Sequence, residues 1–219
     1  MLDKFREKIL YILSGQTDDD TIKAEALLAT DPEYLTNSPL AVGYKTTQEQ
    51  LSLLLNTIIG YSPNNSILDI GAGRGDLYNF ICEFFGKEPA NYFGIEQNPL
   101  LCDVATKKYG MDLLNSIFTA ESTLPKKDWV VACGVFFERK CKTEDRDLQK
   151  LLDEIDVMYN AANVAVSFNL LSPINNEIHD GHFYVHPGLI MDMLIEKYQL
   201  VSIKHNYSNS VYTVTIYKY

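Results

Sequence analysis

The sequence has few cysteines, no long apolar run and no excess of basic residues. Its four cysteines, Cys82, Cys102, Cys133 and Cys141, lie far apart with no C-x-x-C pair. A chain of 219 residues folds without disulfides, so we expect reduced thiols in a cytoplasmic protein. No apolar stretch approaches the length of a membrane span, and charged residues interrupt positions 1–13, which excludes a secretory signal there.

Basic residues are outnumbered, with 19 Lys and Arg against 29 Asp and Glu and a net charge of -10. The average field therefore repels a phosphate backbone, which makes long nucleic acid a disfavoured partner, although a local basic patch would permit it. Hydrophobic residues at 46% and charged residues at 22% are ordinary globular values. The length suits one compact domain with a helical appendage.

Three helices are predicted before position 60. The first spans about 2–13 and the second about 18–29, each with helical spacing of its apolar residues. Thr46 and Glu49 form a capping-box pattern at the start of the third. We expect positions 1–60 to form a helical extension that covers the cofactor and substrate site.

From position 61 to 219, short apolar runs alternate with helical stretches, which predicts buried parallel strands joined by right-handed crossovers. These runs are Ser66–Ile70, Tyr92–Glu96, Ser116–Thr119, Trp129–Cys133 and Val164–Phe168. The last two runs, Leu200–Tyr207 and Val211–Lys218, are separated by only three residues, so they must pair antiparallel. The predicted fold class is therefore α/β, with a mostly parallel seven-stranded sheet closed by a C-terminal antiparallel hairpin.

A glycine loop directly follows the first predicted strand and precedes a predicted helix. It reads Asp69-Ile70-Gly71-Ala72-Gly73-Arg74-Gly75. Alternating glycines let the backbone turn sharply and approach a ligand closely, and both dinucleotides and S-adenosylmethionine bind to such turns. A dinucleotide site requires a small residue where this chain has Asp76, whose carboxylate would repel a pyrophosphate at the helix start. S-adenosylmethionine has no phosphate.

Glu96 ends the next predicted strand, 25 positions after Gly71. An acidic residue at about this spacing accepts hydrogen bonds from the hydroxyl groups of an adenosine ribose. Nicotinamide cofactors carry the same ribose, so Glu96 alone does not distinguish the two ligands.

The residues from Ile67 to Leu77, followed by Gly94-Ile95-Glu96, resemble the cofactor site of class I S-adenosylmethionine-dependent methyltransferases. The terminal hairpin fits their Rossmann-like sheet, whose last strand is antiparallel. The resemblance covers roughly 42–219 and is most specific in the glycine loop. Elsewhere the chain is similar to small stand-alone methyltransferases of bacteria and phages, few of which have an assigned substrate.

The resemblance implies a set of cofactor contacts. These are Asp69, Gly71, Ala72, Gly73 and Gly75 at the methionine part, Glu96 at the ribose, Gln97 and Asn98 beside the adenine, Ala120 and Glu121 at its amino group, and Gly134, Val135 and Phe136 along the passage to the methyl group. From the helical extension, Tyr44 and Gln48 are the best candidates, with plain packing and capping roles as the alternative.

The connection after Phe168 is long and rich in polar side chains. Ligands of open α/β sheets lie at the carboxyl ends of the strands, so we expect this loop to face the methyl acceptor. Asn169, His182 and Tyr184 are the candidate catalytic residues. The methyl group would pass to its acceptor by direct in-line displacement, and a base such as His182 helps only if the acceptor arrives protonated.

A metal site in the same loop is an alternative. Its ligands would be His179, Asp180, His182 and His186. They lie on no regular predicted element and no cysteine accompanies them, so no metal is predicted.

Two motifs of DNA methyltransferases are missing, which narrows the choice of methyl acceptor. The segment from Cys133 to Phe136 lacks the Asn/Asp-Pro-Pro-aromatic motif of base N-methylation in DNA, and no Pro-Cys dipeptide exists for cytosine carbon methylation. With the acidic charge, this favours a small molecule or a peptide side chain. Three alternatives stay open: an RNA or other nucleic-acid methyltransferase, a non-catalytic cofactor-binding module, and an NAD-dependent oxidoreductase. Asp76 and the absence of a Tyr-x-x-x-Lys pair count against the last.

Overall fold

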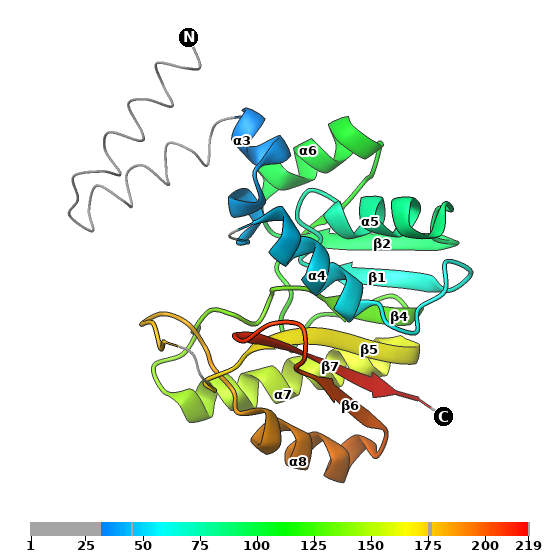
Figure 1. Cartoon of the computed structure of the whole chain (residues 1–219). Coiled ribbons are helices and arrows are strands. Elements are labelled where there is room, and N and C mark those ends of the chain that lie inside the picture. Colours follow the sequence, from blue (N-terminus) through cyan, green and yellow to red (C-terminus); the bar gives the residue numbers. More distant parts are fainter. Residues whose placement is uncertain (1–31, 45, 175–176, 219) are drawn as a thin grey trace, which may run out of the picture. The chain divides into compact units, whose positions relative to one another are not determined.

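The structure is a computed structural model that describes residues 32–44, 46–174 and 177–218 (Figure 1). The chain divides into two compact units, Met1–Thr46 and Thr47–Tyr219. In the first unit, α3 spans Pro32–Asn37 and the 3-10 helix η1 spans Pro39–Val42. The helices predicted at 2–13 and 18–29 lie outside the described residues, and the predicted extension 1–60 stays a prediction.

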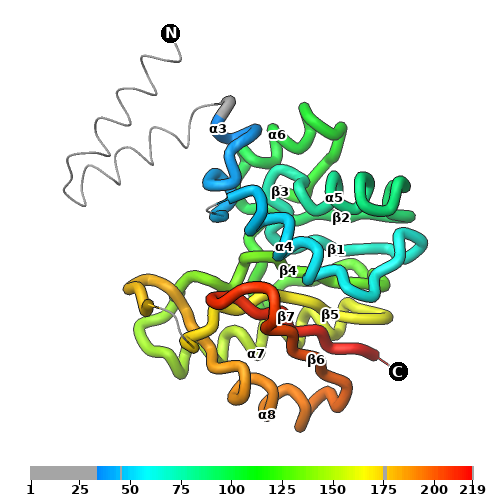
Figure 2. The backbone as a smooth tube through the Cα atoms, in the orientation of Figure 1, coloured from blue at the N-terminus to red at the C-terminus, as the bar shows by residue number. Residues whose placement is uncertain are grey.

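The second unit contains a seven-stranded sheet in the order β3-β2-β1-β4-β5-β7-β6. The strands are β1 (Ser66–Ile70), β2 (Asn91–Glu96), β3 (Leu114–Asn115), β4 (Lys127–Ala132), β5 (Ala162–Leu171), β6 (Val201–Lys204) and β7 (Val211–Tyr217). Neighbouring strands pair in parallel except that β7 runs antiparallel to both β5 and β6. Figure 2 shows β3 at the edge beside β2. The predicted parallel sheet with a closing antiparallel hairpin is confirmed.

Helices cover both faces of this sheet (Figure 1). They are α4 (Thr47–Thr57), α5 (Asp76–Phe85), α6 (Pro99–Tyr109), α7 (Glu144–Ala161) and α8 (Pro187–Tyr198). Within the described ranges, no helix combines the length and the apolar character needed to cross a membrane.

Successive side chains of the central strands pack into two separate hydrophobic cores. Leu68 of β1 packs in a core with residues of α7 and α8, whereas its neighbour Ile67 packs in another with α4 and α5. Successive side chains of a strand point to opposite faces, so a strand covered on both sides is mostly apolar along its length. This explains why the continuous apolar runs predicted the central strands correctly.

Two predicted elements differ from the structure. The strand predicted at Ser116–Thr119 is wrong, because the sheet is joined by β3 at Leu114–Asn115 instead. Phe118 is only 9% exposed and packs into the core from irregular backbone, which explains the misleading apolar signal. The strand predicted to end at Phe168 continues as β5 to Leu171, because β7 pairs with it along its whole carboxyl end.

Candidate functional site

The glycine loop after β1 turns at the point where the strand order reverses, between β2 on one side of β1 and β4 on the other. The N–H groups of Gly71 and Ala72 both donate to the Ile95 carbonyl, at 2.8 and 3.0 Å, which fixes the loop against the end of β2. Ligands of open α/β sheets bind in the crevice at this reversal. The loop therefore lies where a cofactor is expected.

Gly71 has a positive φ of 72° and lies against the loop that follows β4. A Cβ atom at Gly71 would lie 2.5 Å from Cγ2 of Val135, a distance that real Cβ atoms do not adopt. Glycine is thus required both by the backbone conformation and by the close approach of the two loops. This contact brings together Gly71 and Val135, two of the residues that the resemblance assigned to the cofactor.

Glu96 closes the other side of the loop. Its side chain is 7% exposed, and Oε2 accepts a hydrogen bond from the Gly73 N–H at 2.9 Å. Oε1 accepts from the Asn98 N–H at 2.7 Å. Each carboxylate oxygen has a second lone pair, so both bonds hold the carboxylate in place and leave it able to accept from hydroxyl groups.

Asp69 is buried beneath the loop and hydrogen-bonded to Tyr92, whose hydroxyl donates to Oδ2 at 2.5 Å. Burial raises the pKa of Asp69 from 3.8 to about 7; the Tyr92 hydrogen bond opposes this shift, and the charges of Glu96 and Asp76 add to it. A cationic group beside Asp69 would remove part of this penalty. The floor of the loop therefore favours a positively charged ligand.

The carboxylate of Asp76, at the start of α5, is paired with a cation and hydrogen-bonded. Its Oδ2 accepts from Nε of the buried Arg74 at 2.9 Å and from Nε2 of Gln50, in α4, at 2.7 Å. The ion pair reduces the repulsion that Asp76 would exert on a pyrophosphate. Asp69, rather than Asp76, is therefore the carboxyl group that disfavours a pyrophosphate.

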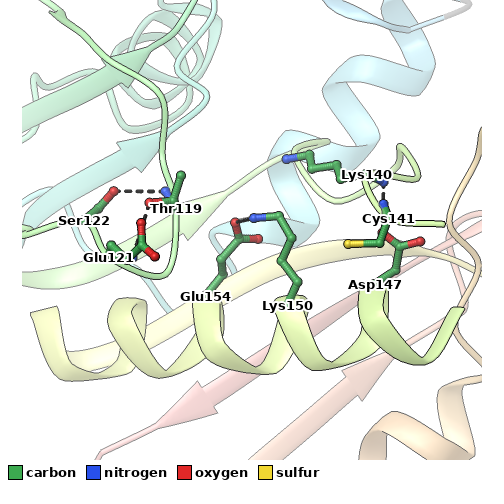
Figure 3. A network of polar contacts seen from close by, with 8 residues as sticks. All are labelled: Thr119, Glu121, Ser122, Lys140, Cys141, Asp147, Lys150 and Glu154. Carbon is green, nitrogen blue, oxygen red and sulfur yellow. Dashed lines mark hydrogen bonds and ion pairs between the residues drawn. The ribbon is translucent and has the colours of Figure 1, made fainter. Parts of the chain in front are cut away.

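The residues predicted to contact the adenine differ in how they are held. Oδ1 of Asn98 accepts from the Leu100 N–H at 3.0 Å and so caps α6, while Gln97 is exposed beside it. Glu121 is also exposed, in a turn in which the Thr119 N–H donates to Oγ of Ser122 at 2.9 Å (Figure 3). Ala120 lies in the same turn. No described contact joins this turn to Glu96, so the roles of Ala120 and Glu121 stay predictions.

On the far side of the glycine loop, Gly134 has a φ of 77° and turns the chain after β4. Phe136 is 4% exposed and its ring meets that of Phe168 edge-on, with centroids 5.7 Å apart. The segment is thus fixed by Phe136 in the core and by Val135 against the glycine loop.

The two contacts predicted from the helical extension fall in different units. Tyr44 follows η1 in the first unit, and its contact with the cofactor stays a prediction. Gln48 lies exposed in the first turn of α4, in the second unit. Gln50, which the sequence analysis did not select, is the α4 residue that reaches the glycine loop.

The structure corrects the placement of Asn169, which lies within β5 and not in the loop. Asn169 is fully buried, and its Nδ2 donates to Oγ1 of Thr213 at 2.9 Å. Thr57 Oγ1 lies 3.2 Å from Asn169 Oδ1, and the Tyr207 hydroxyl lies 2.7 Å from Thr213 Oγ1. Asn169 thus links β5 to β7 and α4, and its catalytic role stays a prediction.

The other two catalytic candidates lie in the connection between β5 and α8. His182 is exposed and pairs through its backbone with Glu138 in an isolated antiparallel bridge. Tyr184 is half-buried, and its hydroxyl donates to the Glu177 carbonyl at 3.3 Å. Their catalytic roles stay predictions.

The histidines of this connection serve several local purposes. Nδ1 of His186 accepts from the Gly188 N–H at 3.1 Å and caps α8, while the His179 N–H donates to the Tyr184 hydroxyl. In the described part of the chain, no group of three or more His, Cys, Asp or Glu is arranged to hold a metal ion.

Sequence reasoning missed Tyr92, Arg74 and Gln50 as neighbours of the loop's carboxylates. A signal for Tyr92 existed, since residues two apart on a strand share a face and Tyr92, Gly94 and Glu96 therefore point the same way. Gln50 gave no such signal, because its partner lies 26 positions away on another helix.

No family model matches the chain, and no curated protein matches it. Solved structures do match. Magnesium protoporphyrin IX methyltransferase of Synechocystis PCC 6803 with bound S-adenosylmethionine has a TM-score of 0.56 at 13% identity and covers 94% of this chain and 99% of its own. The N-methyltransferase NodS of Bradyrhizobium japonicum WM9, in complex with S-adenosylhomocysteine, has a TM-score of 0.56 at 14% identity, covering 89% and 95%.

The pyocyanin biosynthetic protein PhzM has a TM-score of 0.58 at 14% identity, covering 89% of this chain and 61% of its own. At these identities the likeness shows a shared fold. The chain has the Rossmann-like fold of class I S-adenosylmethionine-dependent methyltransferases, as the sequence resemblance predicted.

Proposed function

We propose that this protein is an S-adenosylmethionine-dependent methyltransferase acting on a small molecule or a peptide side chain. The observation that carries the proposal is the acidic glycine loop: Gly71 to Gly75 fixed between β2 and β4, with Glu96 joined to Gly73 and Asp69 buried below. The solved structures with this fold include enzymes that bind S-adenosylmethionine or S-adenosylhomocysteine.

The charge of the loop supports this cofactor over a dinucleotide. S-adenosylmethionine has a sulfonium and an ammonium group and no phosphate, so it suits a site whose floor is Asp69, with its pKa raised to about 7 by burial. A pyrophosphate in the same place would face the buried carboxyl group of Asp69, while the charge of Arg74 is already paired to Asp76.

Different residues would bind different parts of S-adenosylmethionine. Glu96 would accept the ribose hydroxyls, Asp69 would face the methionine ammonium, and the segment from Gly134 to Phe136 would border the methyl group. S-adenosylmethionine supplies an activated methyl group, so the remaining tasks of the protein are to align the acceptor and to exclude water.

Three observations support a small acceptor. The net charge of -10 disfavours a phosphate backbone. The sequence after β4 lacks the proline motif of DNA base methylation. Two proteins of this fold, magnesium protoporphyrin IX methyltransferase and the pyocyanin biosynthetic protein PhzM, are named after small molecules.

Calorimetric titration with S-adenosylmethionine, S-adenosylhomocysteine and NAD tests the cofactor. We expect the first two to bind and NAD not to. Glu96→Gln loses the charge and keeps an oxygen for only one of the Gly73 and Asn98 N–H groups, and we expect binding about 10 to 100 times weaker, as for hydrogen bonds to a charged group. Glu83→Gln on the exposed end of α5 is the control and should leave the affinity unchanged.

Binding of NAD alone would refute the proposal. Equal affinities of the wild type and Glu96→Gln would mean that the ribose lies elsewhere. If S-adenosylmethionine binds but no methyl transfer is found with any acceptor tested, the non-catalytic binding module gains support instead.

A further inference from the structure

Tyr92 of β2 reaches the buried carboxyl group of Asp69 from the neighbouring strand. Asp69 pairs with Gly94 in the register of β1 and β2, and Tyr92 lies two positions before Gly94, so all three face the same side of the sheet. A Cβ atom at Gly94 would lie only 3.2 Å from Cε1 of Tyr92. Glycine at this position therefore leaves room for the Tyr92 ring to extend towards Asp69.

Tyr92 holds one of the two oxygens of this carboxyl group. Its hydroxyl donates to Oδ2 of Asp69 at 2.5 Å, which is within the range of hydrogen bonds from a hydroxyl to a charged oxygen. Within the described part of the chain, Oδ1 accepts no hydrogen bond, and it is not one of the unpaired side-chain atoms that are sealed from solvent. One oxygen is therefore held, and the other can accept from a ligand.

The acidic groups that face Asp69 from the neighbouring elements oppose its ionisation. Burial raises the pKa of Asp69 to about 7, and the charges of Glu96 in β2 and Asp76 in α5 add to this rise. The guanidinium group of Arg74 is already paired with Asp76. The hydrogen bond from Tyr92 acts in the opposite direction and lowers the pKa. Tyr92 therefore favours the ionised form that Glu96 and Asp76 disfavour.

The ionised form of Asp69 matters because the part of the ligand assigned to this place is a cation. The ammonium group of S-adenosylmethionine gains a charge interaction with a carboxylate and none with a neutral carboxyl group. A hydroxyl also donates a stronger hydrogen bond to a carboxylate than to a neutral acid. The Tyr92 hydroxyl thus increases the fraction of Asp69 that is ready for the ammonium group at neutral pH.

We propose that Tyr92 is a positioning residue of the cofactor site: it holds Oδ2 of Asp69 and keeps the carboxylate ionised, so that Oδ1 accepts from the methionine ammonium group. This rests on the proposed function. Tyr92 acts only through Asp69 and does not itself contact the cofactor. It thereby sets the lowest pH at which the site binds the cofactor tightly.

Calorimetric titration with S-adenosylhomocysteine, which has the same ammonium group, compares the wild type with Tyr92→Phe at several pH values. Loss of a hydrogen bond to a charged group should raise the pKa of Asp69 further, by about one pH unit. The affinity of Tyr92→Phe should therefore be about 10 times lower at about pH 6, about 5 times lower at about pH 7 and within about 2 times of the wild type at about pH 9. The ammonium group of the ligand also titrates, but it affects both proteins alike and cancels in the ratio.

Tyr78→Phe is the matched control. The Tyr78 ring meets that of Tyr92 edge-on, with centroids 5.3 Å apart, but its hydroxyl interacts with Cys82 and Glu88 instead of Asp69. Its affinity relative to the wild type should be the same at every pH.

Urea unfolding without ligand is the second measurement, and it remains informative when Tyr92→Phe is less stable than the wild type. The free energy of unfolding falls with rising pH until Asp69 is ionised in the folded state, so in Tyr92→Phe this fall should continue to a pH about one unit higher. An unchanged pH range would overturn the inference.

The pH dependence separates a positioning role from a purely structural one. If Tyr92→Phe lowered the affinity by the same factor at every pH, the inference would be overturned, because a structural defect weakens binding uniformly. A wild type that does not bind S-adenosylhomocysteine would instead refute the proposed function, and with it the role of Tyr92 in cofactor binding. The unfolding experiment would still report whether Tyr92 controls the ionisation of Asp69.

Discussion

The buried Asp69 makes a specific prediction about the stability of the cofactor-free protein. Its pKa is raised by burial from 3.8 to about 7, so the folded protein keeps this proton to a higher pH than the unfolded chain does. Between these two values the folded state binds more protons, and the free energy of unfolding therefore falls as the pH rises. The loss is complete once the pH exceeds the folded pKa.

Asp69→Asn removes this titration and keeps an oxygen that can accept from Tyr92. One pKa unit corresponds to about 1.4 kcal/mol, so the full cost of ionised Asp69 is about 4 kcal/mol. About 2 to 3 kcal/mol of that cost develops between about pH 5 and about pH 8. The stability of Asp69→Asn relative to the wild type should therefore increase by that amount over this range.

Urea unfolding followed by circular dichroism measures this difference at several pH values. Groups that titrate alike in the wild type and in Asp69→Asn contribute equally to the two free energies of unfolding, so their contributions cancel in the difference. Asp128→Asn is the control: the Ser66 N–H lowers the pKa of Asp128, so it titrates below the range and its difference from the wild type should be constant. A constant difference for Asp69→Asn as well would refute the reasoning, because it would mean that Asp69 is not destabilised by its surroundings.

Four further substitutions test the structure of the second unit. Gly75→Ala should lower the free energy of unfolding by about 2 kcal/mol or more, because φ is 85° and the new Cβ would lie 2.6 Å from Cε of Met111. Gly86→Ala, with a φ of 62° and no neighbour within 4 Å, should cost about 1 kcal/mol in the same urea unfolding experiment. Gln50→Ala should cost about 1 kcal/mol by removing the hydrogen bond to Asp76. Asn169→Asp places a charge in a fully buried position and should cost at least about 3 kcal/mol at neutral pH, so much lower Tm values are expected in thermal unfolding.

Local signals in the sequence were sufficient for the centre of the fold. The limits of β1 agree residue for residue with the apolar run Ser66–Ile70. A strand covered on both faces is mostly apolar, with Asp69 as the buried exception in β1, and a sharp turn into a helix requires glycine where φ is positive, so both features are visible in a short window.

The ends of strands were not predictable in the same way. β5 continues through Asn169 to Leu171 because β7 pairs with it there, and the partner lies more than 40 positions away. A polar residue such as Asn169 suggests a loop when it is seen alone. Its partner Thr213 makes it a buried member of a strand.

The surroundings of the candidate site depend on the same kind of distant pairing. Asp147 appears in the sequence as one of several acids in the first turns of a helix, a position that favours acids for reasons unrelated to ligands. Only the fold shows that one oxygen of Asp147 holds the facing loop and that the other is buried without a hydrogen-bond partner. Gln50 and Arg74 were missed for the same reason, since their shared partner Asp76 is meaningful only in three dimensions.

Ionisation of Asp69 should change the stability and the cofactor affinity of this protein in opposite directions. Ionised Asp69 destabilises the free protein, because it is buried beside the charges of Glu96 and Asp76 and its Tyr92 hydrogen bond compensates only partly. A cationic ligand beside Asp69 requires the ionised form, so its affinity should rise as the proton leaves. As the pH rises, the free energy of unfolding should fall and the affinity for S-adenosylmethionine should rise, and both changes should level off above the pKa of about 7. Since both profiles come from one titration, Asp69→Asn should flatten both together, and a variant that flattened only one would separate the cofactor from this carboxylate.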